Sequence, residues 1–299
     1  MTNVKRLIVA VVLALVVVGV TPSALASAGP ALPPLPEPLR TWLTPPEPPQ
    51  KALAKSFEPF QKSLAKTYPG TVGIAIVPVG SDSAITLGKV STGRAWSTLK
   101  VPVSLAAERR LGSAVVSREV KAITFSDNDA AEDLWAALGT TRQSVDAVAA
   151  VLREGHDVRT HVSSELDTPS SFPGYSMWSL ADQARFGAHL PCMPGSTRVL
   201  DLMGSVGPSQ RWGVADLART SRTVTGSAVK GGWGPGTGLS SAFFVRQIGV
   251  ITTGRGQFAV SLAAVPKSNS FSDGAAMLTR VGDWLGRNIT KVPVGRCSL

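Results

Sequence analysis

The chain has 299 residues, of which 43% are hydrophobic and 17% are charged, so it is not intrinsically disordered and can build a folded core. Its formal charge is +10, but no basic run or nucleic-acid-binding motif accompanies that charge, so we expect no nucleic-acid partner. Two cysteines and three histidines show no CxxC or HExxH spacing, so we expect neither a metal centre nor another cofactor.

Residues 1–26 have the pattern of a secretory signal peptide. Lys5 and Arg6 precede an unbroken apolar run over residues 7–20, and small residues follow that run. As a helix the run spans about 21 Å, which is less than the roughly 30 Å of a bilayer's hydrocarbon core. We therefore expect cleavage, no transmembrane segment in the mature protein, and a secreted or cell-wall-associated monomer. An uncleaved anchor that extends into residues 21–26 is the alternative.

Export makes the cysteine pair informative. In an oxidising compartment Cys192 and Cys297 can join and close a loop of about 105 residues, which is nominally worth about 4–5 kcal/mol. The alternative is two separate thiols, one of them in a C-terminal tail.

The next segment, residues 27–50, is so rich in proline that we expect a linker without helix or sheet. A single folded domain, large enough to be a catalytic domain, then occupies residues 51–299. Its first helix has Ser56 as a candidate N-cap and Pro59 in the first turn.

Strands are expected on both sides of a helical middle. Apolar, β-branched runs with turn residues between them predict strands over residues 71–79, 84–90, 224–229, 242–253 and 257–265. The region from about 97 to 190 is mostly helical, and apolar residues on one face predict a last helix over 277–289. This order predicts a mixed α/β (α+β) fold, with sheet parts at about 51–95 and 220–299. A helical lobe at about 97–215 is inserted between them, and a cleft should lie at the seam.

Ser97 and Lys100 form the first candidate catalytic pair. Residues three apart on a helix share a face, so the Lys100 amine can approach the Ser97 hydroxyl. A serine needs such a base to become a nucleophile at neutral pH. An SxxK pair alone is weak, because Ser63 and Lys66 repeat it in the amphipathic first helix.

Two further short motifs follow in the sequence. Ser126-Asp127-Asn128 lies between helical stretches, where a helix N-cap is the ordinary interpretation. Lys230-Gly231-Gly232 ends an expected strand, where the glycines would let a substrate backbone come close and the lysine would bind an anion. A solvated lysine beside a turn is the ordinary alternative.

The three motifs occur in the order SxxK, SxN and KxG, in a chain whose helices lie between two groups of strands. This combination resembles the signature of the penicillin-recognising serine enzymes, the class A β-lactamases and penicillin-binding proteins. The resemblance covers residues 51–290 and includes the Leu-Trp and Leu-Gly pairs after Asn128. It implies a β-lactamase/transpeptidase-like fold with an antiparallel sheet of about five strands flanked by terminal helices.

The resemblance also implies roles for individual residues. Ser97 would be acylated, Lys100 would accept its proton, and Ser126 would relay a proton to the leaving nitrogen. Asn128 would hold the substrate amide and Lys100, and Lys230 would bind the substrate carboxylate. Substrate contacts would come from Gly231, Gly232 and Trp233, and the backbone N–H groups of Ser97 and Trp233 would form the oxyanion hole.

Three features depart from the family pattern. The family's deacylation glutamate falls on Ser163 if Leu166-Asp167 replaces the family's Leu-Asn, so Glu165 lies two residues away. Glu165 is a weak candidate for the deacylation base if a rearranged loop brings it to the site, and a solvated loop carboxylate is the ordinary alternative. Only 29 residues separate Ser97 from Ser126, which indicates a trimmed lobe. Lys-Gly-Gly replaces the commoner Lys-Thr-Gly, so the carboxylate pocket lacks one hydroxyl.

Two groups of residues have open interpretations. Four tryptophans, Trp96, Trp178, Trp212 and Trp233, either line the cleft or pack in the core, with the core favoured for Trp178 and Trp212. The histidines, His156, His161 and His189, have no evident partner and are expected at the surface. Arg211 is a weak candidate for binding a substrate anion.

The sequence therefore predicts an exported active-site-serine hydrolase that forms an acyl-enzyme with β-lactam or peptidoglycan-peptide-like substrates. Without a placed base, slow deacylation would instead make it a penicillin-binding D,D-peptidase-type enzyme. An esterase acting on another small acyl compound, and a catalytically silent cell-wall-binding module on the same scaffold, are further alternatives.

Overall fold

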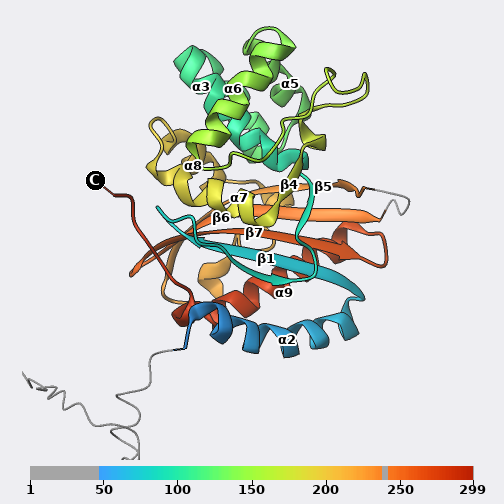
Figure 1. Ribbon diagram of the computed structural model, residues 1–299, viewed down its shortest axis with the longest axis vertical. Coiled ribbons are helices and arrows are strands. Elements are labelled where there is room, and N and C mark those ends of the chain that lie inside the picture. Colours follow the sequence, from blue (N-terminus) through green and yellow to red (C-terminus); the bar gives the residue numbers. More distant parts are fainter. Residues whose placement is uncertain (1–46, 238–241, 299) are drawn as a thin grey trace, which may run out of the picture. The chain divides into compact units, whose positions relative to one another are not determined.

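The computed structural model describes residues 47–237 and 242–298 (Figure 1). The expected signal peptide and most of the expected linker lie outside the described residues. In the described part, no helix combines the length and apolar character needed to cross a membrane.

An antiparallel sheet of five strands organises the domain, in the order β2-β1-β7-β6-β5. The strands are β1 (Gly70–Pro78), β2 (Ile85–Gly88), β5 (Val224–Pro235), β6 (Phe243–Thr253) and β7 (Gly256–Pro266). Each contains most of an expected strand, and a tight turn joins β6 to β7 as expected. Since β5 is at the edge of the sheet, one side of its backbone is not paired with another strand.

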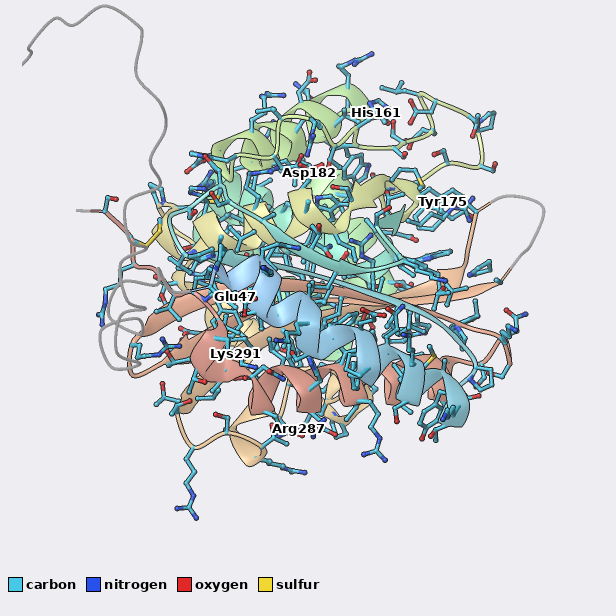
Figure 2. All side chains as sticks on the ribbon, turned by 60° about the horizontal axis from the view of Figure 1, so that its bottom comes forward. Glu47, His161, Tyr175, Asp182, Arg287 and Lys291 are labelled. Atoms are coloured by element: carbon cyan, nitrogen blue, oxygen red, sulfur yellow. A yellow bond between two sulfur atoms is a disulfide. The ribbon has the colours of Figure 1, made fainter. Side chains whose placement is uncertain are left out.

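Both faces of the sheet are covered, which explains the continuous apolar sequence of β1. Helices α2 (Pro49–Thr67) and α9 (Phe271–Arg287) cover one face and α7 (Leu180–His189) covers the other (Figure 1). Figure 2 shows α2 and α9 side by side, with Glu47 near the start of α2 and Arg287 at the end of α9. Ile74 and Ile76 belong to the α2/α9 core, whereas Ala75 and Val77 pack on the α7 side. Because the Ala75 side chain is small, α7 can pack closely on this face of the sheet.

The start of α2 corrects three expectations. The helix begins at Pro49, inside the proline-rich segment, and Pro59 lies within the helix rather than in its first turn. Ser56 is not an N-cap, because its hydroxyl donates to the carbonyl of Leu53 one turn earlier. Proline is tolerated at the first helical position because the N–H it lacks would have no partner there, and burial of Leu53 against the sheet stabilises the added turns.

A helical region is inserted between β2 and β5. Its elements are α3 (Lys100–Leu111), α4 (Val116–Glu119), α5 (Asn128–Ala137), α6 (Thr141–Glu154) and α8 (Thr197–Gly204). Leu105, Leu134 and Val148 are fully buried in its core. A two-stranded ribbon of β3 (Thr92–Arg94) and β4 (Met177–Ser179) connects this region to the sheet. α7 lies within the sequence range expected for the lobe but packs on β1 and β7.

The C-terminal segment is held by a disulfide between Cys192 and Cys297. Cys192 follows α7 and Cys297 follows the last helical turn, so the bond joins segments 105 residues apart. The backbone of the tail also pairs with β7, through Gly295 and Gln257.

Candidate active site

The candidate nucleophile Ser97 lies on a single helical turn, η1 (Trp96–Leu99), between β3 and α3. Trp96 has a φ of 48°, a left-handed conformation that is strained for a bulky residue. η1 lies directly against the edge strand β5. A Cβ added to Gly232 would lie 2.9 Å from the Ala95 carbonyl oxygen and 3.0 Å from the Ser97 nitrogen, so only glycine permits this approach.

Lys100 starts α3 and points its amine into the same region. Its side chain is buried, and Nζ donates to the carbonyls of Ser126 (2.6 Å) and Asp127 (3.0 Å) and to Asn128 Oδ1 (2.8 Å). Burial lowers the pKa of Lys100 to about 8, although the negative charges of Asp127 and Glu132 oppose the shift. Ser97 is not among these hydrogen-bond partners, but both residues line one cavity.

The Ser126-Asp127-Asn128 corner holds its shape through backbone conformation and capping. Ser126 has a φ of 59° and ends a π-helical turn, Val120–Phe125. Asp127 is the N-cap of α5, since its Oδ1 accepts from the Ala130 N–H at 2.7 Å. The helix-cap interpretation is therefore correct for Asp127. The same corner turns the Ser126 hydroxyl toward Lys230 and the Asn128 amide toward Lys100.

Lys230 approaches the corner from β5. Its Nζ donates to Ser126 Oγ (2.9 Å), Gln210 Oε1 (2.5 Å) and the Gly231 carbonyl (3.0 Å), and the side chain is fully buried. Burial, and then the nearby charge of Lys100, lower the pKa of Lys230 well below its ordinary value. The solvated lysine considered from the sequence is therefore wrong.

The free edge of β5 explains how Trp233 could contribute a backbone N–H. The Gly231 N–H points away from β6, because it donates to Gln210 Oε1 at 3.2 Å. Backbone groups alternate in direction along a strand, so the Trp233 N–H also points outward from the sheet. The Ser97 N–H has no acceptor among the described residues. Two donors are thus available beside η1.

A cavity of about 510 Å³ contains the candidate catalytic groups. Ser97, Lys100, Ser126 and Asn128 line it, as do Trp96 and Trp233. Lys230, Gly231 and Gly232, which were expected to contact substrate directly, do not line it. The Trp212 ring packs on Gly231, where a Cβ would come within 2.6 Å of it.

Glu165, the candidate deacylation base, also lines the cavity. It is exposed, and its Oε1 accepts a 2.6 Å hydrogen bond from the Thr141 hydroxyl at the start of α6. That hydrogen bond lowers the pKa of Glu165, so the carboxylate is charged at neutral pH.

Several residues of the site were not identified from the sequence. Glu132, Trp135 and Phe172 line the cavity, and Gln210 bonds Lys230 from outside it. A signal existed for Glu132, which lies one helical turn after Asn128 and therefore on the same face of α5. No local pattern indicated Gln210, because its partner is 20 residues away on another element.

Other candidates lie elsewhere. Ser63 and Lys66 are exposed on α2, and Arg211 pairs with Asp216 outside the cavity. Trp178 and Trp212 are buried in the core and do not line the cavity, as favoured from the sequence.

The histidine expectations are wrong in part: His156 and His161 are exposed as expected, but all three histidines have a partner. His189 is buried, and both His189 and His156 contact Asp82 Oδ1 at 2.9 Å. His161 contacts Asp167 at the same distance. These aspartates are remote in sequence or lie in loops, so no helical or strand spacing indicated them.

Comparisons with known proteins agree on the fold. No family model matches the chain, and no curated protein matches its sequence. Among solved structures, a β-lactamase from Burkholderia vietnamiensis is 16% identical with a TM-score of 0.58, covering 79% of this chain and 97% of that one. A class A β-lactamase from Mycobacterium abscessus is 17% identical with a TM-score of 0.56, covering 79% and 99%. A mutant of penicillin-binding protein PBP-A, in an acyl-enzyme complex with penicillin G, is 17% identical with a TM-score of 0.58, covering 83% and 100%.

The chain therefore has the fold of the serine β-lactamase and penicillin-binding protein superfamily. The fold expectation, a mixed α/β architecture with an antiparallel five-stranded sheet, is confirmed.

Proposed function

We propose that this chain is an exported active-site-serine hydrolase that forms an acyl-enzyme at Ser97 with β-lactam or D,D-peptide-like amides. The observation that carries the proposal is the convergence of Ser97, Lys100, Ser126 and Asn128 on one cavity, with Lys230 bonded to Ser126. Export is supported by the pattern of residues 1–26 and by a disulfide, which is a feature of oxidising compartments.

Acylation begins with proton transfer from the Ser97 hydroxyl to a neutral Lys100 amine. With a pKa of about 8, about 10% of Lys100 is neutral at pH 7. Loss of one proton frees one of the three positions that Nζ uses for donation, and its lone pair can then accept from Ser97. The Ser97 oxygen bonds to the substrate carbonyl carbon, and the N–H groups of Ser97 and Trp233 stabilise the resulting oxyanion.

The C–N bond then breaks, and the leaving nitrogen takes the proton of the Ser126 hydroxyl. Ser126 regains a proton from Lys230, whose Nζ lies 2.9 Å from its Oγ, while Lys100 Nζ is bonded to the Ser126 backbone carbonyl. This half-reaction leaves an ester on Ser97 and an amine, which departs from a peptide substrate and stays attached to the acyl group of an opened β-lactam. Lys100 and Lys230 thereby link proton uptake at the nucleophile to proton delivery at the leaving group.

Hydrolysis of the ester requires a base for the attacking water. Glu165 is the candidate, and its hydrogen bond to Thr141 favours the variant of the proposal in which deacylation is slow. The chain would then behave as a penicillin-binding D,D-peptidase-type enzyme rather than as a fast β-lactamase. A catalytically silent cell-wall-binding module would form no ester.

The test is incubation of the purified protein with a fluorescent penicillin, followed by intact mass measurement and by nitrocefin turnover. A stable adduct that is absent from Ser97→Ala supports a penicillin-binding enzyme. Rapid nitrocefin loss without an adduct supports a β-lactamase. Absence of both, with wild type and Ser97→Ala indistinguishable, refutes the proposal and leaves the binding module.

A further inference from the structure

The wall of the cavity formed by α5 and the loop before β4 is acidic, in contrast to the basic chain. Glu132 and Glu165 line this wall, and the cationic side chain that lines the cavity is Lys100. Its ammonium is already surrounded by three acceptors, namely two carbonyls and Asn128. A chain with a formal charge of +10 thus places two carboxylates beside one lysine amine, whose charge Glu132 partly offsets, around a bound acyl group.

Neither carboxylate forms an ion pair with a basic side chain in the described part of the protein, although the charge of Glu132 acts on Lys100. Glu132 has no hydrogen-bond or ion-pair partner there, and Glu165 accepts only from the neutral Thr141 hydroxyl. By contrast, Asp133, the neighbour of Glu132 that points out of the cavity, pairs with Arg118 at 3.5 Å. Both carboxylates that line the cavity are therefore without an ion-pair partner among the described residues.

Aromatic side chains complete the wall. Trp135, Phe172 and Trp233 line the cavity together with Trp96. An ammonium group over such rings is attracted by their π electrons. Arg94 shows this attraction nearby, since its guanidinium lies 3.7 Å from the centroid of the Tyr175 ring, although neither residue lines the cavity.

We propose that the cavity selects acyl donors whose acyl side chain carries an ammonium group, which Glu132, Glu165 and the aromatic wall receive. This inference rests on the proposed acylation of Ser97 and names the substrate class within it. The substrate is then a β-lactam or peptide amide with a free amine on the acyl side. Apolar acyl groups are accepted less well, and anionic acyl groups are disfavoured by like charge.

Three penicillins test the charge preference because they share one nucleus and differ at the acyl α-carbon. Ampicillin carries an amine there, penicillin G a hydrogen and carbenicillin a carboxylate. Second-order acylation rate constants are measured by competition with a fluorescent penicillin at about pH 6.5, where the amine is mostly charged. We expect ampicillin to acylate about five- to tenfold faster than penicillin G, as one or two exposed ion pairs and a cation–π contact allow. Carbenicillin should be the slowest of the three, and added salt should reduce the differences.

The variants Glu132→Gln and Glu165→Gln, alone and combined, assign the preference to these carboxylates. The double variant should acylate with ampicillin and penicillin G at rates within about twofold of each other, while Asp129→Asn, on α5 outside the cavity, should keep the wild-type ratio. Equal rates in wild type, or carbenicillin as the fastest, overturn the inference while leaving Ser97 acylation intact. No adduct with any penicillin refutes the proposed function itself. The salt dependence of the wild type decides the question even where a variant does not fold.

Discussion

The contact between Gly232 and η1 makes a sharp test of the site, because one methyl group should displace the nucleophile. In Gly232→Ala the new Cβ would lie 2.9 Å from the Ala95 oxygen, 3.0 Å from the Ser97 nitrogen and 3.1 Å from the Thr98 nitrogen. Ordinary contacts of a Cβ begin at 3.4 Å. All three neighbours are backbone atoms, so η1 and β5 must separate by several tenths of an ångström.

That separation moves the Ser97 nitrogen relative to the Trp233 N–H, and both are proposed to bind the oxyanion. Loss of one such donor costs about 10²–10³ in rate, and misplacement by about 1 Å costs about 10². We therefore expect Gly232→Ala to slow acylation by about 10²-fold. Overpacking costs about 1–3 kcal/mol, and each kcal/mol lowers Tm by about 2–4 °C in a domain of this size.

The assay compares acylation by a fluorescent penicillin with thermal unfolding in the same samples. Gly204→Ala is the matched control, because a Cβ at the end of α8 meets nothing within 4 Å. The control should acylate at the wild-type rate. If Gly232→Ala also acylates at that rate while remaining folded, the close approach of β5 does not set the position of Ser97.

Three further predictions follow from single contacts. Lys100→Ala should abolish acylation in a protein that still folds, with a lower Tm because three acceptors lose their buried donor. The wild-type acylation rate should rise with pH through about 8, since the neutral amine is the base. A flat pH profile would exclude Lys100 from that role. Gln210→Ala should lower the free energy of unfolding by about 1–3 kcal/mol in urea denaturation, because it removes an acceptor from the buried Lys230. An unchanged urea midpoint of unfolding would contradict this. Reduction of the bond between Cys192 and Cys297 should lower the free energy of unfolding by nominally about 4–5 kcal/mol. Urea denaturation with and without reductant measures this difference. Coincident curves would show that the bond does not stabilise the folded protein.

The sequence by itself determined the elements whose cause is local. β1 could be predicted because burial on both faces requires a continuous apolar run, and α9 because one apolar face repeats at helical spacing. The order of Ser97, Ser126 and Lys230 also predicted a common site, through the resemblance to the penicillin-recognising enzymes that the three motifs carry together. Even α2 was found, although its start was misplaced because proline at a first helical turn gives no local warning.

Only the tertiary structure decided which groups surround that site. Gln210 bonds Lys230 across 20 residues, Gly232 contacts η1 across more than 130, and Glu132 reaches the cavity only because α5 packs against α3. The same holds for Asp82, which contacts His156 and His189, and for the burial of Lys230. Hydrogen bonding and desolvation depend on what lies within a few ångströms in space, and for these residues those neighbours come from distant parts of the chain.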